Sequence, residues 1–490
     1  MKAIADAIGF NLVVISPTIA LVLTALILLF FTITIESNEK VKQVITFSGV
    51  VSTLFCVFLK FGLFLQNGVS SYFSKKILLD EFSLFGNVLI GLILLFNILP
   101  IWDSSSQLRE KTTEAIILTL MSTSGFMLMV DSENLIMLFI GLEIGSISLY
   151  ALAGLNRVDK LSNEASLKYF LLGSLASCIF IYGVSLVYVS FSVLSVYDFA
   201  TGVGFVGADS VPLTTKLGVI LIFIGLLFKI AAAPFQSWAP DVYQGSPTGY
   251  VGYMASVAKA SAFIVIARLC QVSLRFMPNE FDSFFLFVVI LSVVIGSIFA
   301  SVQDDLKRLL AYSGVVQSGF ILSGIVSGIN GTSASMFYLF AYIIQLIGIF
   351  VIFSIINGKM SSNFNIQDIQ GLIINNKFLA VTFCTFMLGL AGIPLTSGFV
   401  SKFILLTNLW DYQKYLLVSI LLLSTVAGFY FYLKPIWIAT IEKTETPVEN
   451  FKIKRSEYFL ISSLATMTIF FGLVPSSLIN ISRWVVQSYL

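Results

Sequence analysis

The 490-residue sequence contains no histidine and only four cysteines. Without histidine, the chain lacks the side chain most often used for proton relay near neutral pH, and catalytic pairs of Ser or Cys with His are excluded. The four cysteines lie in apolar stretches without CxxC spacing, which predicts buried thiols, no disulfide and no metal site. They are Cys56, Cys178, Cys270 and Cys384.

Charged residues are also scarce, at 11% of the chain, whereas hydrophobic residues make up 57% and the mean hydropathy is +0.96. These values exceed those of water-soluble domains and predict an all-α polytopic membrane protein in contact with the lipid bilayer. The net charge of +2 indicates neither a nucleic acid nor an acidic substrate as partner. The first apolar stretch, roughly 26 residues from Phe10, is longer than a signal peptide core, so we expect the first span to be retained.

Breaks at charged residues, Gly, Pro and Asn divide the chain into fourteen stretches long enough to span a bilayer, which takes about 20 apolar residues. No loop between them exceeds about 20 residues, which leaves no room for a soluble catalytic domain. The sequence also contains no GxGxxG and no P-loop. The expected spans lie near residues 10–34, 43–66, 82–101, 114–130, 134–155, 165–193, 214–237, 248–274, 283–303, 309–328, 333–357, 376–405, 413–440 and 457–482.

The loops between these spans differ in their content of basic residues. Since cytoplasmic loops are enriched in Lys and Arg, the richer set should face the cytoplasm, and an even number of spans then places both termini on the periplasmic side. Loops after odd-numbered spans hold fifteen basic residues: Lys40, Lys42, Arg109, Lys111, Arg157, Lys160, Lys168, Lys307, Arg308, Lys359, Lys377, Lys443, Lys452, Lys454 and Arg455. The opposite side holds seven: Lys2, Lys75, Lys76, Lys216, Arg275, Lys414 and Arg483.

Two of the spans combine a proline with a lysine. The seventh reads FKIAAAPFQSWAP, with Lys229 before Pro234, and the twelfth reads LAGIPLTSGFVSKF, with Pro394 before Lys402. Paired breaks in corresponding helices are typical of transporter inverted repeats, where the broken segment lines a polar cavity; chance is the alternative, because proline is common in membrane helices. We therefore predict that residues 114–275 and 276–441 form two inverted five-helix repeats, preceded by helices 1 to 3 in residues 1–113. Residues 442–490 would form the C-terminal loop and last helix.

Four charged residues lie deep in apolar spans: Glu143, Lys229, Lys259 and Lys402. A charge at a bilayer centre costs about 2.5 to 3.5 kcal/mol, so such residues indicate a functional site. A lysine in an apolar setting is destabilised in its ammonium form and can release its proton near neutral pH. Glu143, with Ser146 one turn away on the same helix face, would favour the charged lysine. The four residues thus suggest proton transfer through the membrane.

Other interpretations are open for each charge. Lys60, Arg268 and Lys434 lie nearer helix ends, where a long side chain usually reaches the interface. The same alternative applies to the three deeper lysines, and Glu143 could be structural. Asp304, Asp305, Lys307 and Arg308 are expected to form a cytoplasmic loop cluster that is solvated or lies at the interface. The many Phe residues are expected to face lipid or to pack between helices.

Several long stretches resemble the antiporter-like membrane subunits of respiratory complex I, the NADH:quinone oxidoreductase, a family related to Mrp antiporters. The resemblance covers roughly residues 75 to 440 and is carried by LFIGLEIGSISLYALAGLNR, SNEASLKYFLLGSLAS, FKIAAAPFQSWAPDVYQGSPT, DDLKRLLAYSGVVQSG and LAGIPLTSGFVSKF. Within the family the N-subunit group is favoured, because Lys402 stands where the M group has glutamate. IQDIQGL at Ile366–Leu372 also resembles the N group, and the chain ends without the long lateral helix of the L group.

The resemblance implies fourteen core helices with helices 7 and 12 broken, and proton transfer by Glu143, Lys229, Lys259 and Lys402. The expected supporting positions are Pro234, Pro394, Gln236, Gln317, Ser146 and Lys434. Many relatives have histidine where Gln236 and Gln317 stand, and an acidic residue where Thr18 follows Pro17. Glutamine can hold water but cannot accept a proton near neutral pH, which argues against an imidazole relay in this chain.

By the same resemblance, the chain is expected to be a proton-translocating subunit without a redox centre of its own. Quinone, FMN and Fe–S clusters would belong to other subunits, and other membrane-arm subunits would be its partners in a hetero-oligomer. The expected location is the bacterial inner membrane or an organellar inner membrane. Two alternatives stand beside this expectation: a cation/proton antiporter of the Mrp type, and a non-pumping structural subunit.

Overall fold

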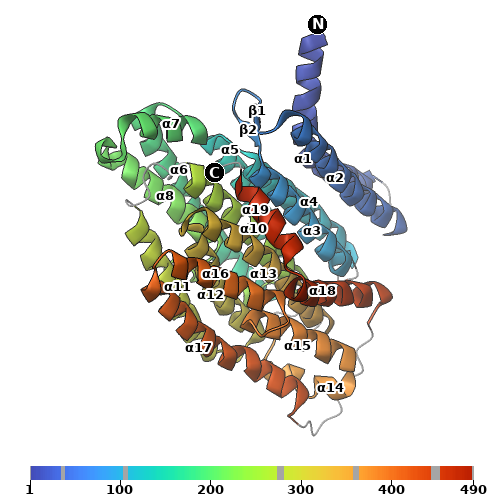
Figure 1. The fold of residues 1–490 in the computed structure, drawn as a ribbon. Helices are drawn as coiled ribbons and strands as arrows, with labels where there is room; N and C mark the ends of the chain where they lie inside the picture. The colour runs from blue at the N-terminus through green and yellow to red at the C-terminus, as the bar shows by residue number, and fades with distance from the viewer. Residues whose placement is uncertain are drawn as a thin grey trace.

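The computed structural model describes residues 2–34, 39–102, 109–272, 281–356, 363–442 and 453–487. These residues are almost entirely helical, and the helices lie side by side in a bundle (Figure 1). Within them the strands are β1 (Ser70–Tyr72) and β2 (Ile77–Leu79), which pair antiparallel in a short hairpin. The prediction of an all-α polytopic fold is confirmed, with this hairpin as a small addition.

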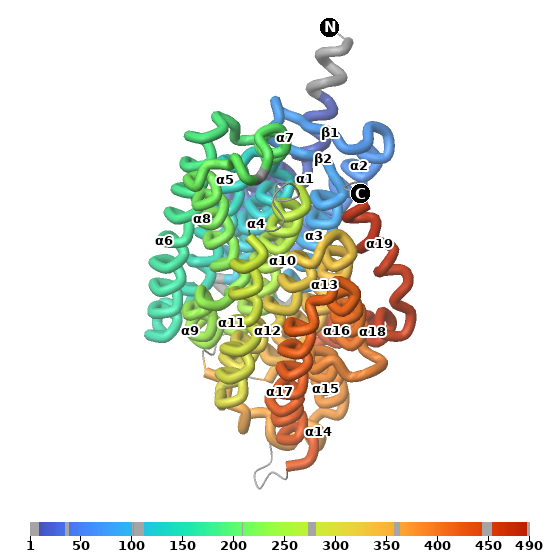
Figure 2. Tube along the Cα trace, turned by 60° about the vertical axis from the view of Figure 1, so that its left-hand side comes forward, coloured from blue at the N-terminus to red at the C-terminus, as the bar shows by residue number. Residues whose placement is uncertain are grey.

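The first half of the chain contributes a peripheral pair of helices and then the first part of the bundle. The helices are α1 (Lys2–Thr34), α2 (Glu39–Asn67), α3 (Glu81–Trp102), α4 (Arg109–Asp131), α5 (Leu135–Ala153), α6 (Lys160–Phe191), α7 (Val196–Val206), η2 (Ala208–Ser210), α8 (Leu213–Lys229), α9 (Trp238–Gly245) and α10 (Thr248–Val272). The hairpin and α7 lie toward one end of the bundle, and α14 lies at the other (Figure 2).

The second half completes the bundle around α10 and α13. Its helices are α11 (Asp282–Ser301), α12 (Leu306–Ile325), α13 (Gly328–Ile356), η3 (Ile366–Ile369), α14 (Leu372–Asn375), α15 (Lys377–Ala391), α16 (Ser397–Asp411), α17 (Tyr415–Thr440), α18 (Arg455–Leu473) and α19 (Ser476–Gln487). α10 packs against α13, and α12 packs against α9, so the two predicted repeats contact each other directly. The division into repeats at residue 276 stays a prediction.

Eleven helices in the described part of the chain are long and apolar enough to cross a membrane: α1 to α6, α10, α11, α13, α17 and α18. The other three expected spans correspond to α8 with α9, to α15 with α16, and to α12. The first two are broken into pieces too short to cross alone, and α12 is less apolar. The order of elements therefore follows the predicted spans, while the total of fourteen stays a prediction.

Burial separates central from peripheral helices. The most apolar stretch of α10 is buried throughout, whereas most of that of α2 is exposed. The exposed side chains of the outer helices are large and apolar, such as Phe58, Val189 and Leu423. A water-soluble protein rarely exposes so many, so these surfaces suit contact with lipid or with other membrane proteins.

Helix starts are fixed by short polar side chains that accept hydrogen bonds from the first free backbone N–H groups. The Asn134 side chain accepts from Ile136 N at the start of α5 (2.9 Å), and Asp159 accepts from Leu161 N at the start of α6 (3.0 Å). Asp305 does the same for Lys307 N at the start of α12 (2.9 Å). These caps satisfy backbone N–H groups that have no partner within their own helix.

Two details differ from the prediction. The expected last span, 457–482, consists of α18 and α19, which are separated at Pro475 because proline cannot continue the helical hydrogen bonding. The expected loop after the sixth span contains α7. Several basic residues used to predict orientation lie outside the described residues, namely Arg275, Lys359, Lys443 and Lys452. The side of the membrane on which each terminus lies stays a prediction.

Candidate functional site

Lys229 is the last residue of α8, where the seventh expected span breaks. Its Nζ donates to Ser146 Oγ at 2.8 Å and to the Tyr150 hydroxyl at 3.0 Å, both on α5. The helix stops because Ala231 adopts a left-handed conformation with φ of 54°, and it resumes at α9. Trp238 Nε1 donates to the carbonyl of Phe228 at 3.0 Å across this break, and Ala231 N donates to the same oxygen. The positively charged side chain thus lies at the negative end of a helix inside the bundle.

Glu143 lies on α5, one turn before Ser146, and is half-buried. Its carboxylate accepts a hydrogen bond from Ser177 Oγ of α6. Among the described residues it forms no ion pair with Lys229; Ser146, which the ammonium contacts, lies between the two charges along α5. The influence of Glu143 on Lys229 stays a prediction, and it requires action through space because the two side chains make no direct contact.

Lys259 lies at the middle of the buried helix α10. Its Nζ donates to the Gly314 carbonyl at 2.7 Å, and lies 3.3 Å from Ser318 Oγ and 3.5 Å from the Tyr342 hydroxyl. Ser318 Oγ also lies 2.7 Å from the carbonyl oxygen of Ile230, the residue that follows Lys229. Ser318 of α12 therefore connects the first helix break with Lys259.

Lys402 lies on α16 and extends back across the second break. Its Nζ donates to the carbonyls of Leu390 (3.1 Å) and Ala391 (2.9 Å), at the end of α15. α15 ends because Gly392 is left-handed, with φ of 81°, a conformation that glycine adopts without strain. A Cβ at Gly392 would lie 2.8 Å from Lys402 Cδ, so any other residue would displace the lysine.

Gln317 connects Lys402 with the rest of the site. Its Nε2 donates to the Leu390 carbonyl at 3.2 Å and to the Tyr432 hydroxyl at 2.9 Å, and its Oε1 accepts from the Tyr338 hydroxyl. Gln317 and Ser318 are neighbours on α12, so this helix contacts both breaks. The three lysines, exposed by only 2% to 7% of their surface, consequently lie along one buried polar line.

Of the other predicted supporting residues, three lie in the two helix breaks and one lies on α17. Gln236 is in the first break, half-buried, and its Oε1 has no hydrogen-bond partner among the described residues. Pro234 and Pro394 lie in the two breaks, as predicted, and are exposed on the outer surface of the chain. Lys434 on α17 forms an ion pair with the exposed Asp304 at 3.1 Å, outside the lysine line. The supporting role of Lys434 stays a prediction.

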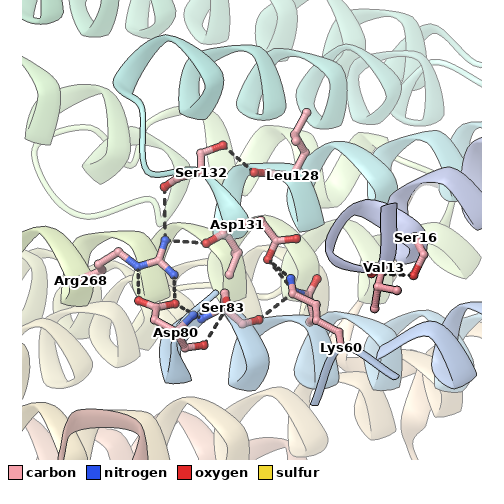
Figure 3. Close-up of polar contacts among 11 residues, drawn as sticks. Val13, Ser16, Lys60, Asp80, Ser83, Leu128, Asp131, Ser132 and Arg268 are labelled. Atoms are coloured by element: carbon pink, nitrogen blue, oxygen red, sulfur yellow. Dashed lines mark hydrogen bonds and ion pairs between the residues drawn. The ribbon is translucent and has the colours of Figure 1, made fainter. Parts of the chain in front are cut away.

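The prediction that Lys60 and Arg268 reach the membrane interface is wrong. Both are buried, Lys60 at 0% and Arg268 at 2% exposure. Each forms an ion pair with a buried carboxylate, Lys60 with Asp131 and Arg268 with Asp80 (Figure 3). The expected spans 82–101 and 114–130 leave Asp80 and Asp131 just outside their ends, so their pairing with Lys60 and Arg268 was not predicted.

The prediction for residues 304–308 is also wrong in part. Asp305 and Lys307 are buried, because Asp305 caps α12 and Lys307 Nζ donates to the Ser246 carbonyl at 2.9 Å. Sequence reasoning also missed the hydroxyl groups that complete the lysine line. The signal available for them was the presence of polar residues within apolar spans. They are Ser318, Tyr338, Tyr342 and Tyr432.

The arrangement can hold and pass protons but offers little other chemistry. Ammonium, hydroxyl and amide groups can exchange hydrogen bonds along the line. Within the described residues no group of His, Cys, Asp and Glu is suited to hold a metal ion. A membrane-embedded helical bundle with two broken helices and a lysine beside each break belongs to the class of transporters with charge sites at mid-membrane.

Comparison with known proteins defines the family. The sequence model of the NADH:quinone oxidoreductase/Mrp antiporter transmembrane family matches residues 132–428, and the chain belongs to this family. It is 32% identical to NADH-quinone oxidoreductase subunit N of Trichlorobacter lovleyi over 97% of both chains. It is 34% identical to NAD(P)H-quinone oxidoreductase subunit 2 from the chloroplast of Mesostigma viride, covering 76% of this chain and 74% of the relative. The resemblance predicted from the motifs is confirmed.

Solved structures agree with this assignment. A chain of respiratory complex I from Thermus thermophilus with bound aureothin superposes with a TM-score of 0.80 and 26% identity, covering 95% of this chain and 98% of that one. A chain of the Mrp complex from Dietzia sp. gives a TM-score of 0.84 at 18% identity, with 97% of each chain covered. At that identity the second match shows a shared fold alone.

Proposed function

We propose that the chain is a proton-translocating membrane-arm subunit of an NADH:quinone oxidoreductase, of the subunit N type. The observation that carries this proposal is the buried line of Lys229, Lys259 and Lys402, joined through α12. The similarity to subunit N over 97% of both chains supports it. The chain itself would hold no redox centre; quinone, FMN and Fe–S clusters would reside in other subunits.

In this proposal each lysine holds a proton as an ammonium and releases it as a neutral amine. Lys229 depends on the negative field of Glu143 across Ser146. When Glu143 gains a proton, that field is lost, and the Lys229 ammonium is destabilised in its apolar surroundings. The proton can then leave toward Ser318 and Lys259, and from there past Gln317 toward Lys402. One proton leaves each donor as one is bound by the next acceptor, so the charge of the line as a whole changes only at its two ends.

The backbone is part of the proposed site. The carbonyls of Ile230, Leu390 and Ala391 lie at helix breaks, where they lack their usual helical partners. They contact Ser318 and Lys402, as described above, and stabilise positive charge. A broken helix within a membrane is tolerated only where protein or water surrounds it, which is consistent with a hydrated proton path at this level.

We also propose the finer features that accompany this function. The chain would act within a hetero-oligomer of membrane-arm subunits in a bacterial or organellar inner membrane. Both termini would lie on the periplasmic side or its organellar equivalent. Residues 114–275 and 276–441 would form the two inverted repeats, each with one broken helix, within fourteen spans.

The test uses the assembled complex in sealed vesicles, with NADH oxidation and proton uptake measured together. Lys229→Met, Lys259→Met and Lys402→Met should each lower the number of protons moved per NADH, whereas Lys414→Met, which removes a half-exposed partner of Asp282, should not. Normal pumping with all three lysines replaced would indicate a structural subunit. Exchange of Na⁺ for protons by the purified chain in liposomes would instead indicate an antiporter.

A further inference from the structure

A second cluster of buried charge lies at the hairpin end of the bundle. It contains Lys60 of α2, Asp80 immediately before α3, Asp131 at the end of α4 and Arg268 near the end of α10 (Figure 3). All four side chains are exposed by 3% or less. Two cations and two carboxylates in such surroundings are costly unless fully paired. The role proposed for the lysine line does not explain why these four charges are buried together.

One half of the cluster is permanently charged. Arg268 Nε donates to Asp80 Oδ2 at 2.9 Å and Nη2 donates to Asp80 Oδ1 at 2.5 Å, a two-bond contact. Arg268 Nη1 donates to the Val130 carbonyl at 2.6 Å. Ser83 N adds a further bond to Asp80 Oδ1 at 2.8 Å. Because arginine keeps its proton in proteins, this half cannot change its protonation state.

The other half is different. Lys60 Nζ donates to Asp131 Oδ1 at 2.6 Å, and Asn87 Nδ2 donates to the same oxygen at 2.6 Å. Lysine can give up its proton when buried. In a medium of low polarity, an ion pair and the neutral pair of amine and carboxylic acid approach each other in free energy, since burial disfavours both charges. Lys60 and Asp131 can therefore exchange a proton.

A buried acceptor lies beside this pair. Asn87 Oδ1 is buried and has no hydrogen-bond partner among the described residues, while its Nδ2 is held by Asp131 and by the Ser83 carbonyl at 2.8 Å. A buried carbonyl oxygen without a donor is destabilising. It would be satisfied by a water molecule or by a newly protonated group next to Asp131.

The cluster also lies between the lysine line and the bundle surface. On the inner side, Arg268 follows Lys259 by nine residues on α10, roughly 13 Å along the helix. On the outer side, the buried Glu133 accepts from Ser71 Oγ of the hairpin at 2.5 Å and from Ser195 Oγ at 2.7 Å. Glu133, two residues after Asp131 in the chain, thus links this part of the bundle to the hairpin.

We propose that Lys60 and Asp131 form a proton-exchanging pair, a further proton-transfer site at the hairpin end of the bundle. The Lys60 ammonium gives its proton to the Asp131 carboxylate, which leaves an amine and a carboxylic acid with no change in total charge. The acid then releases the proton toward the hairpin, and the amine takes up another from the interior. The Asp80–Arg268 pair positions Asp131 through the backbone of α4. This inference rests on the proposed function of the lysine line.

The assignment goes beyond the family match, which begins at residue 132. Lys60, Asp80 and Asp131 lie before it, and only Arg268 lies within it. The alternative is that the pair only fastens α2 to the bundle. The two hypotheses differ in what they require. A structural role needs only opposite charges or good packing at these positions, whereas proton exchange needs a side chain that can lose its proton.

The experiment compares two variants in the assembled complex. Lys60→Met with Asp131→Leu removes both charges together and leaves none unpaired, which structure alone tolerates. Lys60→Arg keeps the ion pair but cannot release its proton. We expect each to lower proton pumping per NADH by at least about tenfold, with the complex assembled. The control removes the exposed pair that joins the hairpin to α7, Lys75→Met with Asp198→Leu, and should pump normally.

Two readouts separate the outcomes. Infrared difference spectra during turnover should show a carboxylic acid band that disappears in Asp131→Asn. Full pumping by Lys60→Arg, or by the double variant, would overturn the inference. If Lys229→Met abolishes pumping in the same assay, the proposed function stands even when this inference fails. If Lys229→Met pumps normally, the function itself is wrong. Should the double variant not assemble, Lys60→Arg and the infrared band still decide.

Discussion

Lys402 and Gln317 bind the same atom, the carbonyl oxygen of Leu390 at the end of α15, at 3.1 and 3.2 Å. When two donors share one acceptor, each hydrogen bond draws electron density from the oxygen and so weakens the other hydrogen bond. Loss of a proton from Lys402 would therefore strengthen the bond from Gln317. This relationship couples the protonation of a lysine on α16 to the position of a side chain on α12.

The coupling predicts the effect of changing Gln317. Gln317→Leu leaves the Tyr338 and Tyr432 hydroxyls without their partner and should reduce stability by about 1 to 3 kcal/mol. It should also slow proton pumping, whereas Gln317→His should be tolerated because imidazole can donate and accept. Pumping and NADH oxidation measured together in vesicles test this. Equal pumping in the Leu variant would limit Gln317 to packing.

Gln236 gives a matched comparison in the first break. Its Oε1 has no protein partner in the described part of the chain, so Gln236→Leu should cost little stability. If the side chain orders water, the same change should slow pumping. Thermal stability of the complex and its pumping rate, measured on the same preparation, separate the two effects. Unchanged pumping would remove Gln236 from the proton path.

Lys402 should tolerate neither alanine nor arginine. Lys402→Ala removes the proton carrier, and Lys402→Arg keeps the positive charge but cannot lose its proton. Both complexes should assemble and pump poorly. A lysine that only reaches toward the interface would behave differently, since arginine would replace it well. Full pumping by Lys402→Arg would therefore refute a protonation cycle at this position.

Glu143→Gln should impair pumping without preventing assembly. The change removes the negative field that acts on Lys229, while the amide can keep the contact with Ser177. Ser177→Ala is the matched control for the hydrogen bond, because it leaves the carboxylate in place. Pumping should fall further in Glu143→Gln than in Ser177→Ala. Normal pumping in the Gln variant would contradict a role for Glu143 in loading Lys229.

The orientation can be tested at the hairpin. Lys75 lies there, well exposed, and the hydrogen bond and charge of Asp198 raise the pKa of its ammonium, so Lys75 stays charged at neutral pH. A cysteine in place of Lys75 and a tag at Leu490 should both react with impermeant reagents only from the periplasmic side. Labelling of either from the cytoplasm would reverse the proposed topology.

The sequence was sufficient to locate the spans and the deep charges. Charge scarcity and proline position identified the two broken helices, and Lys229, Lys259 and Lys402 were recognised because charges in apolar runs are rare. Their connections could not be predicted. Ser318 reaches Ile230 only because α12 packs across the first break, a long-range contact that leaves no periodic signal.

The incorrect predictions for Lys60 and Arg268 have one physical cause. Lys60 and Arg268 were expected at the interface because a cation near a helix end usually reaches water. Asp80 and Asp131 lie at helix ends too, and packing encloses them next to the cations. The position of a cation near a helix end therefore does not predict its exposure to solvent when a carboxylate from a neighbouring helix lies beside it in the folded bundle.

The carbonyls of Leu390 and Ala391 have a practical consequence for mutagenesis. They belong to the main chain, so replacing the Leu390 side chain leaves both ligands of Lys402 in place. Leu390→Ala would therefore be silent although the carbonyl of residue 390 helps to hold the lysine. A change in the backbone of the break, such as Gly392→Ala, would instead displace the two carbonyls from Lys402. We expect such a variant to behave like a Lys402 variant although the lysine is still present.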